Sequence, residues 1–216
     1  MRKKIPGTHL EVENIFCIGR NYSEHIKELK NAVPTEPVVF IKPTSSIIYS
    51  GDKLALPSQS ARVDHEVEIV VALAKGGKNL SEAQAIESIA GIGVGVDFTA
   101  RDLQDKAKEK GLPWSVCKGF DGFAAISSFV KAPKDAEALR NLHFTLEVNG
   151  EQRQVGNSAD MLNSIPALIC YLSTVYTLSP GDLIFTGTPQ GVAPLKKGDH
   201  ILSKLEDWTE LKIEVV

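Results

Sequence analysis

Short segments in which apolar and polar residues alternate are the commonest pattern along this chain. They are rich in β-branched residues and bounded by turn residues, which is typical of strands. We predict strands at residues 14–18, 38–41, 46–49, 64–73, 92–97, 123–126, 143–148, 183–186, 201–205 and 209–215. The dipeptide Asn149-Gly150 separates residues 143–148 from residues 152–155 and predicts a two-residue hairpin turn.

Helical patterns are fewer and shorter. We predict helices at residues 23–29, 81–89, 99–110 and 164–174, of which the last is the most apolar. The strands outnumber the helices and do not alternate with them as βαβ units would. The chain also lacks internal repeats and Gly/Ser-rich or Pro-rich linkers. We therefore predict one domain over residues 1–216, with an α+β fold built on a mixed or antiparallel sheet.

Composition and charge narrow the classes of partner. The chain is 43% hydrophobic and 24% charged, as in soluble globular proteins, with a formal net charge of -3. Arg2-Lys3-Lys4 is the only basic run, so we expect neither a nucleic acid nor a membrane as partner. The apolar window at residues 164–178 is too short to span a bilayer, and we expect no secretory signal. Three cysteines without C-x-x-C spacing indicate neither disulfides nor zinc, which suits a reducing cytoplasm.

The segment at residues 63–73 is the first candidate for chemistry. Alternate side chains of a strand share a face, which places Asp64, Glu66 and Glu68 side by side at a spacing of about 6 to 7 Å. Three neighbouring carboxylates repel one another, which raises their pKa values or favours a bound cation. Oxygen ligands of this kind suit Mg²⁺, Mn²⁺ or Ca²⁺. A half-exposed strand with a solvated acidic face is the alternative that this local pattern leaves open.

Further motifs make this pattern specific. A glycine-laced strand that ends at Asp97 precedes a helix start that contains Arg101 and Gln104. The other motifs are Gly19-Arg-Asn-Tyr-Ser-Glu-His25, Phe40-Ile-Lys-Pro43, Gly111-Leu-Pro-Trp114, Cys117-Lys-Gly-Phe120 and Thr186-Gly-Thr-Pro-Gln-Gly-Val192. Together they closely resemble the fumarylacetoacetate hydrolase family, in the family's order from about residue 14 to the end. More narrowly, the chain resembles the small single-domain members that act on acylpyruvates or oxaloacetate.

The resemblance implies a metal site. The family's H-E-x-E strand supplies two ligands and a later aspartate supplies the third, which correspond here to Glu66, Glu68 and Asp97. Asp64 shares their face, but the family motif does not assign it to the metal. The family metal is normally Mg²⁺, and Mn²⁺ or Ca²⁺ can replace it. The resemblance also implies the family's rolled mixed sheet with a few short helices, and a homodimer.

His25 and Glu28 form a candidate catalytic dyad. They stand three residues apart on a predicted helix, so their side chains point to the same side. A carboxylate beside an imidazole raises its basicity and fixes its tautomer, as a base that activates water requires. On spacing alone, a surface pair is the alternative. The resemblance implies the dyad that small family members carry on a mobile lid, with His25 as base and Glu28 as its orienter.

Five further residues are candidates for contacts with substrate. Arg101 and Gln104 suit a substrate carboxylate and an enol oxygen, and the resemblance implies that they bind substrate. Lys118 matches the family's active-site lysine, whose ammonium can stabilise an enolate. Thr188 offers a hydroxyl from a segment whose alternative is a plain structural turn. Arg20 either binds substrate or forms a structural salt bridge.

The favoured function is metal-dependent hydrolysis of a C–C bond in acylpyruvates of the acetylpyruvate or fumarylpyruvate type. In this hypothesis, water activated by the dyad attacks the distal carbonyl, and pyruvate and a carboxylic acid are released. Tautomerisation or decarboxylation of oxaloacetate, or isomerisation of a hydroxy-dienedioate, is the alternative, because all these reactions need a stabilised enolate. A metal-binding module with a structural acidic strand is the non-enzymatic alternative. The expected partner is a small 2-oxo acid.

Overall fold

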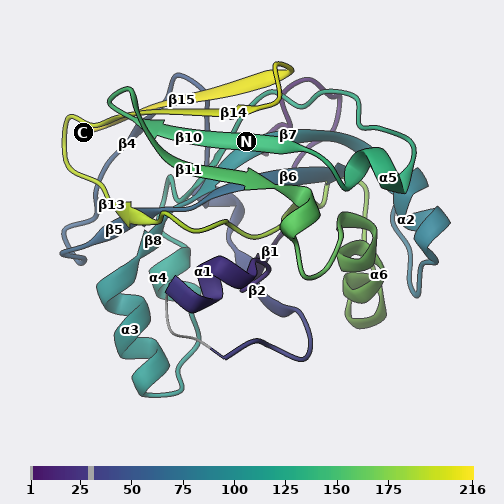
Figure 1. Ribbon diagram of the computed structural model, residues 1–216, viewed down its shortest axis with the longest axis horizontal. Coiled ribbons are helices and arrows are strands. Elements are labelled where there is room, and N and C mark those ends of the chain that lie inside the picture. The colour runs from purple at the N-terminus through teal and green to yellow at the C-terminus, as the bar shows by residue number, and fades with distance from the viewer. Residues whose placement is uncertain (1, 29–31) are drawn as a thin grey trace.

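A seven-stranded mixed sheet forms the centre of the protein (Figure 1). The computed structural model describes residues 2–28 and 32–216. The strand order is β2-β1-β12-β6-β7-β9-β3, with β1 parallel to β12 and β3 parallel to β9. The strands are β1 (Ile15–Gly19), β2 (Val38–Lys42), β3 (Ile47–Tyr49), β6 (Val67–Leu73), β7 (Ile89–Asp97), β9 (Ala124–Ile126) and β12 (Leu183–Phe185).

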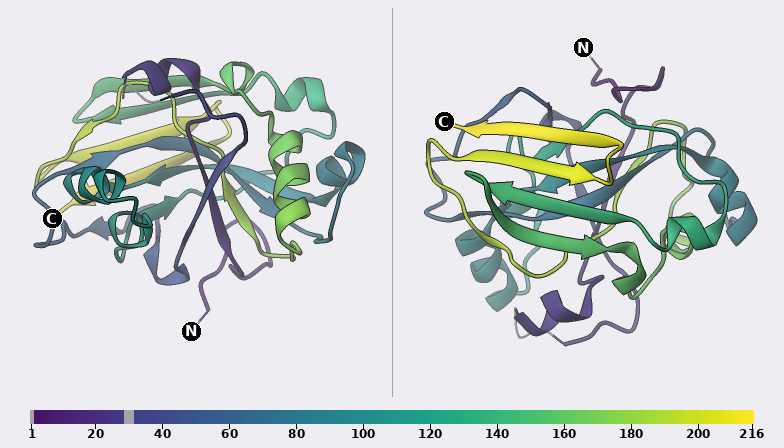
Figure 2. Two further views of the ribbon diagram at one scale, coloured as in Figure 1. Left: turned by 90° about the horizontal axis from the view of Figure 1, so that it is seen from below. Right: turned by 45° about the horizontal axis from the view of Figure 1, so that its top comes forward.

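Two hairpins and the short strand β4 build a second, five-stranded sheet, in the order β11-β10-β14-β15-β4. Its strands are β4 (Lys53–Leu54), β10 (His143–Val148), β11 (Glu151–Asn157), β14 (His200–Leu205) and β15 (Thr209–Val215). The right view of Figure 2 shows the two hairpins side by side. Asn149 and Gly150, between β10 and β11, have φ angles of 54° and 79°, as a two-residue hairpin turn requires. The predicted turn is confirmed.

The smallest sheet changes the prediction for residues 64–73. It holds β5 (Val63–His65) between β13 (Ala193–Pro194) and β8 (Thr99–Ala100). The segment is therefore two strands that separate at Glu66, because β5 pairs with β13 and β8 whereas β6 pairs with β12 and β7. The predicted helix at 99–110 begins only at Arg101, since the two residues before it pair with β5.

Short helices surround the sheets. They are α1 (Ser23–Glu28), α2 (Glu82–Ser88), α3 (Arg101–Glu109), α4 (Ser115–Lys118), α5 (Ala136–Leu139) and α6 (Ile165–Val175), with 3-10 turns at Thr44–Ser46 and Ser158–Asp160. In Figure 1, α1, α3 and α4 lie below the sheets. The last residue of the predicted helix 23–29 lies outside the described residues. No helix in the described part of the chain is long and apolar enough to cross a membrane.

The strand β6 is buried on both faces. One face, formed by Val67, Ile69, Val71 and Leu73, belongs to the larger hydrophobic core together with residues of the five-stranded sheet. On the other face, Val70 and Ala72 belong to a second core that includes Phe185. The face that carries Glu66 and Glu68 therefore continues into an apolar core. The alternative of a solvated acidic face is wrong.

Gly95 lets β7 lie close to its neighbours. A Cβ atom at this position would lie 2.6 Å from Val70 Cγ2 and 2.8 Å from Phe185 Cε1, distances that packed atoms do not adopt. Gly95 is also paired with Glu68 across the β6–β7 ladder. The glycine-laced strand thus preserves the packing beside the acidic residues.

Candidate metal and substrate site

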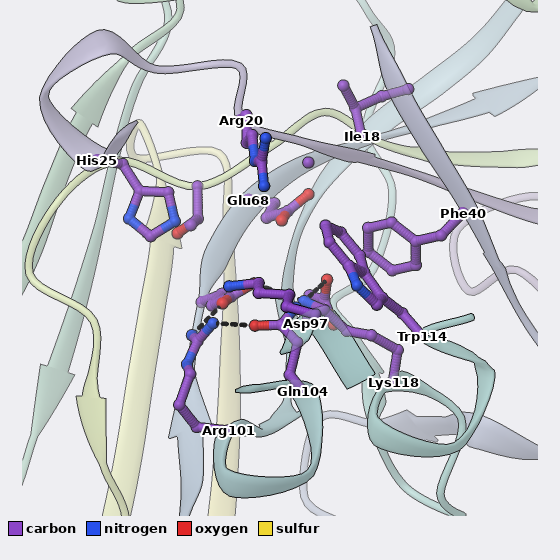
Figure 3. Close-up of a pocket in the computed structure, with 14 residues that line it drawn as sticks. Ile18, Arg20, His25, Phe40, Glu68, Asp97, Arg101, Gln104, Trp114 and Lys118 are labelled. Atoms are coloured by element: carbon purple, nitrogen blue, oxygen red, sulfur yellow. Dashed lines mark hydrogen bonds and ion pairs between the residues drawn. The ribbon is translucent and has the colours of Figure 1, made fainter. Parts of the chain in front are cut away.

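Four strand ends meet at one end of the seven-stranded sheet. The strand β6 runs antiparallel to β7 and to β12, so the start of β6 lies beside the ends of both. The strand β1 runs parallel to β12 and ends there too. Glu66, Glu68 and Asp97 therefore line one pocket with residues that follow β1 and β12, such as Arg20 and Thr188. Figure 3 shows this pocket.

Three carboxylates form an acidic cluster in the pocket. Ligand oxygens of Glu66, Glu68 and Asp97 all lie within 4.8 Å of one another, and all three residues are buried. Burial, together with the charges of Asp97 and Glu66, raises the pKa of Glu68 well above its ordinary value. Among the described residues, the Glu68 carboxylate accepts one hydrogen bond, from the Gly187 N–H at 2.7 Å.

Lys118 joins two members of this cluster. Its Nζ atom donates to Glu66 Oε2 and to Asp97 Oδ2, both at 2.7 Å. Burial lowers the pKa of Lys118, but the two carboxylates outweigh burial and raise it above its ordinary value. Burial likewise raises the pKa of Glu66, but Lys118 and Arg101 outweigh it and lower that pKa. Lys118 is therefore a charged ammonium that faces two candidate metal ligands.

A second lysine lies behind Asp97. Lys42 is fully buried, and its Nζ atom lies 2.7 Å from Asp97 Oδ1. Its protons are directed at the backbone oxygens of Phe98 at 3.2 Å, of Phe123 at 2.8 Å and of Lys118. Asp97 Oδ1 consequently accepts no hydrogen bond from the described residues. Lys42 stabilises the Asp97 carboxylate by charge.

The acidic cluster fits a hard divalent cation. Glu68 forms no ion pair with a described residue, and a buried carboxylate without a counter-charge is strongly unfavourable. Asp97 Oδ1 is buried without a hydrogen bond. All the donor atoms are carboxylate oxygens, which Mg²⁺ and Mn²⁺ prefer over softer ligands. Glu66, Glu68 and Asp97 are therefore the residues that would hold such an ion.

Asp64 lies outside the acidic cluster. Arg62 Nε donates to its Oδ1 at 2.8 Å, and Arg101 Nε donates to its Oδ2 at 2.9 Å. Arg101 also donates to Glu66 Oε1, and to Gln104 Oε1 at 2.6 Å. Asp64 is thus paired with two arginines, and Arg101 holds Glu66 in place from the side of α3.

Arg101 and Gln104 both line the pocket, but they present different groups to it. Three of the five N–H donors of Arg101 are engaged, two by the carboxylates of Asp64 and Glu66 and one by Gln104. Because a guanidinium only donates hydrogen bonds, the Gln104 atom that faces it is the oxygen. The Gln104 NH₂ group is therefore the one available to donate to a ligand. Arg101 orients both Glu66 and Gln104.

The His25–Glu28 pair has the geometry of a general base with an orienter. His25 lines the pocket, and its Nδ1 atom lies 3.1 Å from Glu28 Oε2. Since a carboxylate only accepts, Nδ1 carries the proton and Nε2 has the free lone pair. Burial lowers the pKa of His25, against the opposing effects of Glu66 and Glu28. The imidazole is therefore neutral near pH 7.

The segment at residues 186–191 contacts several parts of the site. Thr188 lines the pocket, and the Gly187 N–H donates to Glu68. The Gly191 N–H donates to Glu28 Oε1 at 3.0 Å. The segment therefore contacts one candidate metal ligand and the orienter of the candidate base.

Two basic residues in the pocket form no ion pair with the described part of the chain. Arg20 lines the pocket with a φ angle of 61°, which is uncommon for a non-glycine residue. It forms no ion pair with any residue that the structure describes, and its Nε atom is buried without a hydrogen bond. Lys108 of α3 also lines the pocket, and burial, followed by the charge of Arg101, lowers its pKa. The structural salt bridge considered for Arg20 is therefore not found among the described residues.

Lys42 and Lys108 were not predicted as site residues, although both leave a signal in the sequence. Lys42 closes the apolar strand β2, where a lysine is unusual unless it is paired. Lys108 stands four residues after Gln104 and therefore on the same face of α3. Gln154, which contacts Thr188, was not predicted either.

Comparison with known proteins identifies the family. The model of the fumarylacetoacetate (FAA) hydrolase C-terminal family matches residues 14–216. The mitochondrial oxaloacetate tautomerase FAHD1 of Bos taurus is 41% identical over 203 residues, which cover 94% of this chain and 91% of the relative. This chain therefore belongs to the fumarylacetoacetate hydrolase family, a family of enzymes, as its sequence motifs indicate.

Solved structures show the same fold. A candidate fumarylacetoacetate isomerase/hydrolase from Oleispira antarctica has a TM-score of 0.95 and 41% identity, with full coverage of both chains. A fumarylpyruvate hydrolase from Pseudomonas aeruginosa, in complex with Mn²⁺ and pyruvate, has a TM-score of 0.92 and 35% identity. The match covers 100% of this chain and 95% of that one. The predicted α+β fold with a rolled mixed sheet is confirmed.

Proposed function

We propose that this protein is a divalent-metal-dependent enzyme that interconverts the keto and enol forms of oxaloacetate. One observation carries the proposal. A neutral imidazole base, with Nε2 free of described protein partners, lines the same pocket as a buried cluster of three carboxylates. Enolisation needs a base for the proton on carbon and a positive centre for the enolate oxygen, which a divalent ion held by the three carboxylates would supply.

Oxaloacetate is the preferred substrate for two reasons. The Bos taurus relative carries the name of an oxaloacetate tautomerase. In addition, Arg20 and Lys108 line the pocket and form no ion pair with any described residue. Two unpaired cations suit a dicarboxylate better than a monocarboxylate, because each carboxylate then finds a counter-charge.

The protein residues have distinct roles in the proposed reaction. A divalent ion held by Glu66, Glu68 and Asp97 would polarise the 2-oxo group as a Lewis acid. His25 Nε2 removes a proton from C3, and the electron pair of the C–H bond moves toward the carbonyl oxygen. Glu28 holds the Nδ1 proton and stabilises the imidazolium that forms.

The proton then moves to oxygen. The Lys118 ammonium lies beside the acidic cluster and stabilises the negative charge on the enolate oxygen. His25 returns the proton to that oxygen, which gives the enol and restores the neutral base. The Gln104 NH₂ group and the Thr188 hydroxyl hold the substrate carboxylate. No atom is lost or gained, as tautomerisation requires.

The test is the rate of enol–keto exchange of oxaloacetate, followed by ultraviolet absorbance with Mg²⁺ and with chelator. We expect His25→Gln to lose about 10²- to 10⁴-fold in kcat, the usual contribution of a general base. His143→Gln is the matched control, since His143 also faces a glutamate, Glu206 at 3.5 Å, but its side chain is 60% exposed. Activity that resists chelation, or equal losses in both variants, would contradict the proposal.

Acylpyruvate hydrolysis is the second candidate function. The dyad also suits activation of water, and the Pseudomonas aeruginosa neighbour is named a fumarylpyruvate hydrolase. In this reaction His25 takes a proton from water, whose oxygen attacks the distal carbonyl. The C–C bond breaks, and its electron pair forms pyruvate enolate, which is protonated at carbon. Release of pyruvate from acetylpyruvate or fumarylpyruvate, faster than oxaloacetate exchange, would favour this candidate.

Four further expectations join the proposal. We propose Mg²⁺ as the ion, with Mn²⁺ supported by the Pseudomonas aeruginosa neighbour. We also propose a homodimer. The edge strand β2 lies beside the segment at residues 112–116, and together they expose three large apolar side chains. These are Ile41, Leu112 and Val116, which are 47%, 55% and 68% exposed. Sedimentation of Val116→Glu beside the wild type tests this proposal, because a charge at a dimer interface favours the monomer. A single domain over residues 1–216 and a cytoplasmic location stay predictions.

A further inference from the structure

Gln154 is a buried polar residue close to the pocket that the proposed mechanism does not use. It lies on β11 and is 1% exposed, whereas the next residue, Val155, is 51% exposed. A β-bulge causes this arrangement, since Leu146 pairs with Gln154 while Glu147 pairs with Gln152. The extra residue reverses the alternation of β11 and turns a glutamine toward the buried face.

The Gln154 amide has one orientation only. Its Oε1 atom accepts a hydrogen bond from the Val67 N–H at 3.1 Å, and a backbone N–H can only donate. Its Nε2 atom donates to the Pro189 carbonyl oxygen at 3.0 Å, and a carbonyl can only accept. Exchange of the oxygen and the nitrogen would break both bonds.

This orientation determines the hydrogen bonding of Thr188. Gln154 Nε2 also lies 2.9 Å from Thr188 Oγ1, so Nε2 donates and the hydroxyl oxygen accepts. The proton of the hydroxyl cannot point at Gln154. No residue in the described ranges accepts it, and Thr188 lines the pocket. The hydroxyl is therefore a donor with one free direction, which is the pocket.

His65 completes the set of partners of Gln154. Its Nδ1 atom lies 2.9 Å from Gln154 Oε1, which also accepts from Val67, so this oxygen receives two donors. All four hydrogen-bonding positions of the amide are thus engaged. These partners join β11, the start of β6 and the segment at residues 186–191.

We infer that Gln154 is a positioning residue that fixes the Thr188 hydroxyl as a hydrogen-bond donor to an anionic oxygen of the 2-oxo acid. The inference rests on the proposed function, because that function supplies the anionic ligand. A donor that is already oriented loses little entropy when the ligand arrives, which favours binding. The effect of Gln154 on binding must therefore act through Thr188.

A double-mutant cycle tests this coupling. Pyruvate binding to the Mg²⁺-loaded protein is measured by calorimetry for the wild type, Gln154→Glu, Thr188→Val and the double variant. In Gln154→Glu, a carboxylate oxygen replaces the amide donor, so the Thr188 proton turns toward it and away from the pocket. We expect pyruvate affinity to fall by about ten- to hundredfold, the value of one hydrogen bond to a charged group.

The second background separates positioning from a general structural role. In Thr188→Val the hydroxyl is already absent, so adding Gln154→Glu should change pyruvate affinity by less than about twofold. Equal losses in both backgrounds would show that Gln154 acts on the fold or by charge, and would overturn the inference. Gln154→Met repeats the cycle without a new charge, and the same non-additivity is expected.

Two further measurements keep the test decisive. If the Gln154 variants do not fold, Thr188→Ser and Thr188→Val decide, since serine keeps the hydroxyl and should bind pyruvate at least tenfold more tightly than valine. Equal affinity of these two variants would overturn the inference. Failure of the proposed function looks different, because the wild type itself would then not exchange oxaloacetate, whatever the variants do to pyruvate binding. A wild type that binds no pyruvate would overturn the inference as well.

Discussion

Replacement of Lys42 by methionine removes a buried charge and leaves the length of the side chain nearly unchanged. In the wild type, the Lys42 ammonium lies 2.7 Å from Asp97 Oδ1 and donates to three backbone carbonyl oxygens. Without it, the hydrogen bond from Lys118 is the one that the Asp97 carboxylate keeps among the described residues, and the three carbonyls lose a donor in a site closed to water. We expect a severe loss of stability.

The size of this loss follows from the burial of the pair. Lys42 and Asp97 have side chains that are 0% and 1% exposed. Removal of one partner of a buried ion pair costs about 3 to 5 kcal/mol. In a chain of 216 residues each kcal/mol lowers Tm by about 2 to 4 °C, so Tm should fall by about 6 to 20 °C.

Calorimetric unfolding in chelator measures this loss in the protein alone. Lys53→Met is the matched control, because Lys53 pairs with Glu214 at 3.0 Å while its side chain is 60% exposed. An exposed pair contributes about 1 kcal/mol or less, so the control should lose at most a few degrees. Similar values of Tm for the two variants would refute the reasoning that burial makes the Lys42 contact strong.

Four other perturbations have expected outcomes. Glu68→Gln should weaken Mn²⁺ binding by more than about 100-fold in a calorimetric titration. In chelator it should raise the free energy of unfolding by on the order of 1 kcal/mol, because burial and the neighbouring carboxylates disfavour a charge at this position and glutamine carries none. The wild-type kcat/KM should fall with decreasing pH only below about 6.5, since the pKa of His25 is lowered and the neutral ring is the base. In Glu28→Gln, a contact that raises this pKa is lost, so the acidic limb should move to lower pH while kcat falls; a shift to higher pH would contradict the assignment. Gly95→Ala should lower the free energy of unfolding by about 1 to 3 kcal/mol, because the added methyl group overpacks the core, and thermal unfolding measures this loss. Gly19→Ala is the control and should lower it less, because the nearest atom to a Cβ at that position is a Trp114 ring atom at 3.3 Å.

The residues of the candidate site could be predicted because their motifs are local. Glu66 and Glu68 stand two residues apart, and the antiparallel pairing of β6 with β7 then brings Asp97 to them. Sequence alternation could not separate Asp64 from the other two carboxylates. Asp64 differs from the other two because β5 and β6 separate at Glu66, and because Asp64 accepts hydrogen bonds from Arg62 and Arg101. Both features are tertiary contacts.

The residues that sequence analysis missed depend on register. A two-residue turn at Asn149-Gly150 with regular pairing would place Val155 on the inner face of β11. The bulge beside Glu147 reverses this order and buries Gln154 in its place. Nothing in the alternation of residues 152–155 indicates a bulge, because its extra residue is a charged one at the surface.

The pairing of β1 with β12 has a consequence for biosynthesis. These neighbouring strands are far apart along the chain, as the hydrogen bond of 2.7 Å between Asn14 and Asp182 shows across 168 positions. Since β12 lies between β1 and β6, the sheet cannot close until the ribosome has delivered most of the polypeptide. Until then β1 and β6 each present an open edge to other nascent chains. The protein therefore has to reach its fold late and slowly, and we expect chaperones that shield strand edges to raise its yield.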